Sequence, residues 1–174
     1  MINGQSVASR ALQTLLETCD AVLLAARSMT APIALEADAL GATVLVPEAA
    51  SLGMGHSLAA LAAAQPEHHP AAETLVVALA DMPWIGPATI AELIDASRTG
   101  DAIVQPVFAG GRGHPVVFPA RYRAALAACT GDTGAREVLR QNAGNVLLVR
   151  VNDRGVVRDV DTPMDLQPQM GDAG

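Results

Sequence analysis

Aspartates in two distant segments are the side chains of this sequence best suited to hold a metal ion. Asp81 directly follows the apolar run L-V-V-A-L-A at residues 75–80, which has the composition of a strand buried on both faces. Open α/β sheets bind their ligands beyond the carboxyl ends of such strands. Pro83 would end the strand because it offers no N–H to the ladder. Asp81 is therefore a candidate catalytic residue and metal ligand, and a loop-capping aspartate is the alternative.

The second acidic segment reads D-V-D-T-P-M-D-L and begins at Asp159. Mg²⁺ normally recruits one or two carboxylates together with substrate phosphates, so Asp81 needs a partner. Asp159 and Asp161 lie on the same side of an extended segment, because side chains alternate there. Thr162 and Asp165 are explained instead by a variant of the helix capping box. We expect Asp81, Asp159 and Asp161 to face one Mg²⁺ site.

A glycine turn at residues 53–58 (G-M-G-H-S-L) precedes a helical pattern. Gly53 and Gly55 would leave backbone N–H groups open to a ligand, and a helix start favours anionic groups. Ser57 could hydrogen-bond a nucleobase edge. The alternative is an ordinary helix start with a capping serine.

Two later turns combine glycines with basic side chains. In G-G-R-G-H-P, Arg112 and His114 could bind a small anionic substrate. In G-D-T-G-A-R, Gly134 and Arg136 lie where a helix begins, a place suited to phosphate. An ordinary glycine hairpin and an exposed arginine beside a helix cap are the respective alternatives.

The composition excludes several classes of function. The net charge of −7 disfavours nucleic-acid and anionic-membrane surfaces, and no apolar run approaches the ~18 residues of a membrane span. All eleven basic residues are arginine, which rules out a P-loop lysine and Schiff-base chemistry. Cys19 and Cys129 have no metal-like spacing, so we expect a reduced, cytoplasmic setting.

These candidate residues must be positioned by strands that alternate with helices along the chain. Such alternation predicts an α/β domain with a mostly parallel sheet and right-handed crossovers, here over residues 1–166 with a loose tail at 167–174. A late antiparallel hairpin is expected after residue 103. The predicted strands are 21–26, 43–47, 75–81, 103–108, 115–118 and 146–151, the predicted helices are 6–18, 32–40, 57–64, 87–97, 121–128 and 135–141, and 65–71 is a predicted loop.

Taken in order, the motifs resemble the nucleotidyltransferases that attach a nucleotide to the molybdenum cofactor, and most closely their cytidylyltransferase branch. That branch has G-M-G-x-S-L, G-D-x-P, G-H-P-V-x-F, G-D-x-G-A-R and D-x-D-T-P-x-D-L. The corresponding residues here are 53–58, 80–83, 113–118, 131–136 and 159–166. The resemblance implies a three-layer, Rossmann-like (GT-A-like) nucleotidyltransferase fold. It also implies Mg²⁺-dependent transfer of CMP from CTP to molybdopterin.

The resemblance also implies roles for residues. Asp81 and one of Asp159 and Asp161 would be metal ligands, and Ser57 with its glycines would lie against the base and ribose. His114 and the glycine turn around Gly134 would face the molybdopterin side.

The sequence departs from the family at its beginning. The family's opening glycine-rich loop, roughly L-A-A-G-x-S-x-R-M-G followed by lysine, has no counterpart here, so we expect the first strand of the sheet to be missing. For the same reason we expect little transferase activity from this chain alone. A homo-oligomer, or a molybdoenzyme or chaperone, is a candidate partner. The alternatives are a non-catalytic nucleotide-binding or interaction module, transfer to a sugar or alcohol phosphate, and GTP in place of CTP.

Overall fold

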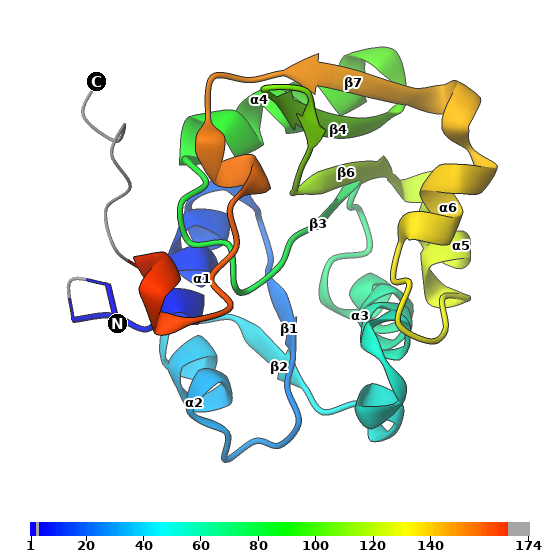
Figure 1. The fold of residues 1–174 in the computed structure, drawn as a ribbon. Helices are drawn as coiled ribbons and strands as arrows, with labels where there is room; N and C mark the ends of the chain where they lie inside the picture. The colour runs from blue at the N-terminus through cyan, green and yellow to red at the C-terminus, as the bar shows by residue number, and fades with distance from the viewer. Residues whose placement is uncertain (3, 167–174) are drawn as a thin grey trace.

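The computed structural model describes residues 1–2 and 4–166 and shows strands covered by helices on both sides (Figure 1). The expected loose tail at 167–174 lies outside the described residues. Among the described residues, no helix is long and apolar enough to cross a membrane.

The strands fall into two hydrogen-bonded groups. β1 pairs in parallel with β2, and a separate mixed sheet has the order β3-β6-β4-β5, with β7 parallel to β4. The antiparallel β6 lies between β3 and β4, so antiparallel pairing extends beyond the predicted hairpin. The strands are β1 (Leu23–Ala25), β2 (Thr43–Leu45), β3 (Thr74–Val77), β4 (Ile103–Phe108), β5 (Gly111–Arg112), β6 (Val116–Pro119) and β7 (Val146–Arg150).

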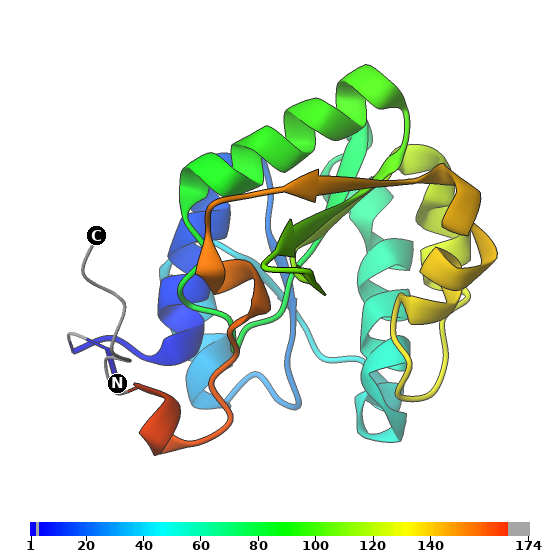
Figure 2. The ribbon, with the colours of Figure 1, turned by 45° about the horizontal axis from the view of Figure 1, so that its top comes forward.

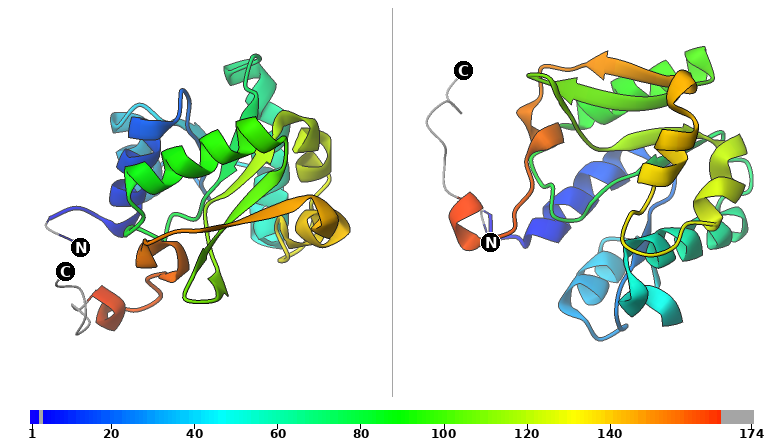
Figure 3. Two further views of the ribbon diagram at one scale, coloured as in Figure 1. Left: turned by 90° about the horizontal axis from the view of Figure 1, so that it is seen from above. Right: turned by 45° about the vertical axis from the view of Figure 1, so that its right-hand side comes forward.

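Helices cover the strands from two sides. α1 packs against α4 on one side and α3 against α5 on the other, with the strands between them (Figure 2). Figure 3 shows α4 crossing the strands of the larger sheet. The α-helices are α1 (Val7–Thr18), α2 (Pro32–Ala39), α3 (Met54–His68), α4 (Pro87–Gly100), α5 (Arg123–Ala127) and α6 (Arg136–Gln141), and short 3₁₀ turns span Glu48–Leu52, Ala120–Tyr122, Ala143–Asn145, Arg154–Val157 and Pro163–Leu166.

Helix ends follow the sequence signals in most places. The Ser6 hydroxyl accepts from the Ser9 N–H and caps α1. Pro32 starts α2 and Pro87 starts α4, because a first-turn proline loses no intrahelical bond. The predicted loop at 65–71 is wrong in its first half, since α3 continues through Pro66 to His68.

β3 is shorter than the apolar run suggests. Its ladder with β6 ends at the pair Val77–Val116. The preceding residue, Pro115, has no N–H, and the N–H of His114 donates to the Val156 carbonyl (2.8 Å). With no donor left on β6, the chain after Val77 leaves the sheet as a loop.

No described strand connects the two groups of strands. β1 pairs only with β2, and β3 only with β6, within the part of the chain that the structure describes. The two groups of strands are therefore not hydrogen-bonded to each other among the described residues.

The core has three apolar clusters, built mainly from aliphatic side chains. One lies between α4 and the larger sheet, a second between that sheet and α3, α5 and α6, and a third beneath α1 and α2. The first two hold β3, β4 and β6 in place and so fix the loop that carries Asp81.

Candidate active site

Asp81 lies in the loop between β3 and α4. The strand ends at Val77, so the expectation that Pro83 stops it is wrong, and Asp81 lies beyond the strand end rather than on it. Its Oδ1 atom is buried and has no hydrogen-bond partner among the residues that the structure describes. Burial, and then the negative charges of Asp159 and Asp161, raise the pKa of this carboxyl group.

The acidic segment near the carboxyl end runs beside that loop, as Figures 1 and 3 show. The Val160 N–H donates to the main-chain carbonyl of Asp81 at 2.9 Å. The side chains of Asp159 and Asp161 on either side are exposed. The structure thus brings the three predicted metal ligands to one place.

These carboxylates are not assembled into a finished metal centre. Among the described residues, no three histidine, cysteine, aspartate or glutamate side chains are arranged so that they could hold one metal ion. The neighbouring Thr162 and Asp165 form the predicted capping box, because the Asp165 carboxylate accepts from the Thr162 N–H (2.7 Å) and hydroxyl (2.8 Å).

Trp84 holds the two segments together. The Arg158 guanidinium lies 4.6 Å from the centre of its ring, and that of Arg10 lies 5.4 Å from it. Arg10 also donates to the Pro83 carbonyl (3.0 Å). Sequence reasoning missed these contacts; the one available signal was that Trp84 is the chain's single tryptophan.

Asp153 is a second positioning residue that sequence reasoning missed. One carboxylate oxygen accepts from the Gly86 N–H (2.9 Å) and the Thr89 hydroxyl (2.7 Å) at the start of α4. The other accepts from the Gly155 N–H (2.8 Å). Asp153 therefore caps a helix from a distant segment and ties that segment to the Trp84 loop.

The glycine hairpin places His114 beside Asp81. A Cβ on Gly113 would lie 2.1 Å from the Val156 carbonyl oxygen, so only glycine fits this crossing. Burial lowers the pKa of His114, while its neighbour Asp81 acts in the opposite direction. Arg112 is exposed at the tip of the hairpin.

The two other glycine turns pack against each other. The Gly55 N–H donates to the Gly131 carbonyl (2.7 Å), and a Cβ on Gly53 or Gly55 would overlap the backbone of residues 130 and 131. The expectation that the Gly55 N–H is open to a ligand is therefore wrong. Close packing of the two turns accounts for both glycines.

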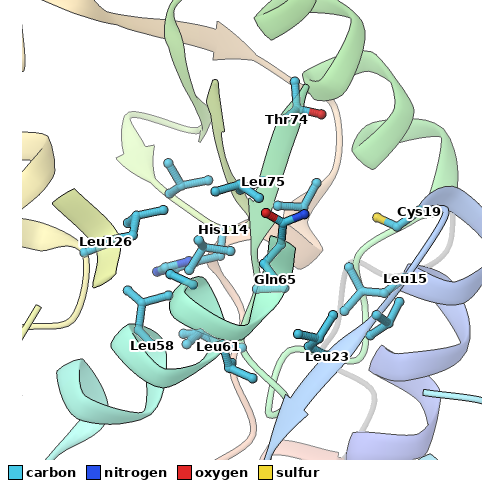
Figure 4. Close-up of a pocket in the computed structure, with 18 of the residues that line it drawn as sticks. Leu15, Cys19, Leu23, Leu58, Leu61, Gln65, Thr74, Leu75, His114 and Leu126 are labelled. Carbon is cyan, nitrogen blue, oxygen red and sulfur yellow. The ribbon is translucent and has the colours of Figure 1, made fainter. Parts of the chain in front are cut away.

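One cavity of about 850 Å³ collects most of the predicted binding residues. Its polar rim includes hydroxyl, imidazole and guanidinium groups together with the carboxylates of Asp20 and Glu73. Apolar side chains make up much of the remaining lining (Figure 4). The guanidinium groups of this rim suit an anionic ligand. Asp81, Asp159 and Asp161 are not among the described residues that line the cavity. Ser57, Arg112, His114, Gly134 and Arg136 line it.

The chain is similar to a curated relative and to several solved structures. The chain is 37% identical over 121 residues to nicotine blue oxidoreductase of Paenarthrobacter nicotinovorans, a match that covers 64% of this chain and 56% of that protein. The chain therefore spans little more than half the length of this curated relative.

The Mycobacterium tuberculosis H37Rv protein Rv0371c, solved as a complex with manganese, is 26% identical with a TM-score of 0.76, covering 95% of this chain and 85% of that one. The molybdopterin-guanine dinucleotide biosynthesis protein A of Archaeoglobus fulgidus shares the fold, with 16% identity, a TM-score of 0.61, and coverage of 95% and 84% of the two chains.

The Rossmann-like nucleotidyltransferase fold expected from the motifs is thus confirmed. The model of the MobA-like NTP transferase domain matches residues 1–146. This match covers most of the chain, including Asp81 and the three glycine turns, so the protein belongs to the family of MobA-like NTP transferase domains.

Proposed function

We propose that this protein is a nucleotidyltransferase that binds CTP with Mg²⁺ and transfers CMP to the phosphate of molybdopterin. The single observation that carries the proposal is the position of Asp81. Its buried oxygen has no hydrogen-bond partner within the described residues, and the segment of Asp159 and Asp161 is fastened beside it.

Asp81, Asp159 and Asp161 supply oxygen donors of the kind that Mg²⁺ prefers, although the described side chains are not arranged as a finished metal site. A buried carboxylate with a raised pKa next to two more carboxylates is unfavourable without a compensating positive charge. Asp81 would hold the ion together with Asp159 or Asp161. When bound, it would neutralise phosphate charge in a reaction that depends mainly on positioning.

The cavity rim supports the placement of the two substrates. Arg112 and Arg136 supply permanent positive charge for phosphate or for an anionic acceptor. Burial lowers the pKa of His114, which favours its neutral imidazole form. It can therefore hydrogen-bond the acceptor without adding charge. Ser57 would contact the base.

A non-catalytic nucleotide-binding module is the second candidate. It is favoured by a specific observation, the absence of any lysine among the 174 residues. Both candidate functions predict that the protein binds a nucleotide, and only the transferase predicts turnover of CTP.

Isothermal titration with CTP and GTP, each with and without Mg²⁺, tests the binding step. We expect Mg²⁺-dependent CTP binding that Asp81→Asn weakens at least tenfold, about 1.4 kcal/mol. Asp95→Asn changes an exposed carboxylate on α4 and should leave the affinity for CTP unchanged. Metal-independent binding, or none, would contradict the proposal.

Release of pyrophosphate from CTP in the presence of molybdopterin separates the two candidates. We expect a slow but Mg²⁺-dependent and Asp81-dependent release. Binding without any release would favour the non-catalytic module.

A further inference from the structure

The outer edge of β7 is an exposed apolar surface that takes no part in the proposed function. β4 bonds to β6 and β5 on its other side, so β7 is the last strand at this edge of the larger sheet (Figure 1). Its sequence, V-L-L-V-R at residues 146–150, is apolar up to the final residue. Leu147 and Leu148 are 42% and 43% exposed. Single exposed leucines are common, whereas two adjacent ones on an edge strand form a surface that another strand can cover.

These two leucines lie on opposite faces of the sheet, because side chains alternate along a strand. Val149 packs against the apolar cluster beneath α4, so Leu147 lies on that face. Val146 packs against the cluster to which α6 contributes, so Leu148 and Arg150 lie on the face of α6. β7 therefore has an exposed leucine on each face, as expected for a strand that has a neighbour on both edges.

The backbone groups of alternate β7 residues point to the open edge. The Val151 N–H donates to the Val107 carbonyl at 3.1 Å, just beyond the parallel ladder of β7 with β4. In a parallel ladder alternate residues bond to the neighbouring strand, so the odd-numbered residues of β7 bond to β4. The N–H and C=O groups of the even-numbered residues, centred on Leu148, face outward. Among the described strands, none pairs with this edge.

The charges around β7 favour a second copy of the same edge as the neighbour. The chain has a net charge of −7, yet residues 138–152 contain no aspartate or glutamate, so two copies can meet here without repulsion between carboxylates. The basic residue of β7 is Arg150 at its carboxyl end. Its other end follows α6 and the turn Ala143–Asn145, and the carboxyl end of a helix carries partial negative charge. An antiparallel copy brings each arginine to the negative end of the other strand.

We propose that two copies of this chain associate edge to edge through β7, antiparallel, about a two-fold axis at Leu148. Leu148 then lies opposite its own copy, Val146 opposite Arg150, and Leu147 opposite Val149. In this register the even-numbered residues face one another and exchange hydrogen bonds through their free backbone groups. The larger sheets of the two copies become one sheet, and the exposed leucines are covered on both faces.

The association leaves the candidate active site open. No residue of β7 is among the described residues that line the cavity. An edge of five residues buries less surface than a standard stable interface, so we expect a dimer with a dissociation constant in the micromolar range.

Sedimentation velocity of the chain of residues 1–174 over a range of concentrations, without nucleotide or metal, measures the association. We expect a monomer–dimer equilibrium. Leu148→Lys should weaken the dimer at least tenfold, because the two-fold axis places two lysines directly opposite each other. The matched control is Leu35→Lys on α2, which changes another exposed leucine (60% exposed) and should leave the equilibrium unchanged.

Cysteine cross-linking tests the register. A mixture of Leu147→Cys and Val149→Cys chains should form a disulfide-linked dimer, because a non-bonded antiparallel pair has Cα atoms about 4.5 Å apart, within the reach of a disulfide. Either variant alone should cross-link several times less, since its two cysteines lie diagonally at about 7–8 Å. The unmodified chain is the background control, because Cys19 is half-buried and Cys129 is buried.

These measurements can overturn the proposal in three ways. A chain that stays monomeric at every concentration contradicts it. A dimer that Leu148→Lys does not weaken, or that Leu35→Lys weakens equally, forms through another surface and contradicts it too. Cross-linking that is no stronger in the mixture than in the single variants shows that the strands do not pair about Leu148. None of these readouts depends on metal or nucleotide binding.

Discussion

The backbone N–H of Val160 donates to the carbonyl oxygen of Asp81 at 2.9 Å. This hydrogen bond joins the loop between β3 and α4 to a segment near the carboxyl end. Asp159 and Asp161 directly precede and follow the bonded residue Val160. The backbone therefore holds the two aspartate-bearing segments side by side, although the negative charges of Asp159 and Asp161 act on Asp81.

Repulsion and burial make the charge of Asp81 unfavourable in the absence of a cation. We predict that Asp81→Asn raises the melting temperature at pH 7 by about 1–2 °C, a small value because the site is partly solvated. The folded protein holds this proton more tightly than the unfolded chain. The wild type therefore loses stability as pH rises through the raised pKa.

The higher melting temperature of Asp81→Asn should disappear below the ordinary aspartate pKa of 3.8. At such pH the Asp81 carboxyl group of the wild type is protonated in both the folded and the unfolded chain. Thermal melts of both proteins from pH 3 to 8 measure this, with Asp95→Asn as the control. A variant that is less stable than the wild type at pH 7 would contradict the account.

The contact of Arg158 with Trp84 should contribute to stability and to metal binding together. We predict that Arg158→Met lowers the free energy of unfolding by about 1 kcal/mol and weakens Mn²⁺ binding, although Arg158 is not a ligand. Urea unfolding followed by the fluorescence of Trp84 measures the first effect. The control is Arg150→Met on β7, because the Arg150 side chain is exposed. Equal effects of the two substitutions would exclude a role for the contact between Arg158 and Trp84.

Gly113 is required by the crossing of the hairpin over Val156. We predict that Gly113→Ala destabilises the protein by about 3 kcal/mol or more, because its methyl group would meet a backbone oxygen. Gly144→Ala is the matched control, since nothing lies within 4 Å of its Cβ position. Chemical denaturation compares the two, and similar midpoints would show that the crossing is not as tight as described.

Asp153 should behave as a structural residue. We predict that Asp153→Ala costs about 2–3 kcal/mol, because it leaves the donors of Gly86, Thr89 and Gly155 without their carboxylate. Asp153→Asn should recover part of the loss, since one amide oxygen can still accept. An alanine variant as stable as the wild type would show that water replaces the carboxylate at no cost.

Local signals in the sequence predicted most of the elements. Pro32 and Gly41 frame α2, Ser6 caps α1, and the strand at 103–108 has the predicted bounds, because each depends on residues adjacent in the chain. α3 differs because Pro66 lies in its last turn. A proline there removes one hydrogen bond without ending the helix.

Tertiary contacts were beyond what the sequence could predict. The early end of β3 depends on the His114 N–H bonding to Val156, and the N–H of Gly55 is taken up by Gly131. The cation–π contacts of Trp84 join residues from three distant segments. Local spacing singles out the three aspartates in the sequence, and their role as metal ligands stays a prediction. The residues that position them come from distant segments and could not be found in this way.

Titration with Mn²⁺, monitored by electron paramagnetic resonance of the free ion, tests the central claim most directly. The account predicts one site in the wild type, weakened at least tenfold by Asp81→Asn and by the double substitution of Asp159 and Asp161 with asparagine, and unchanged by Asp95→Asn. Wild-type Mn²⁺ affinity in the Asp81→Asn variant would contradict it.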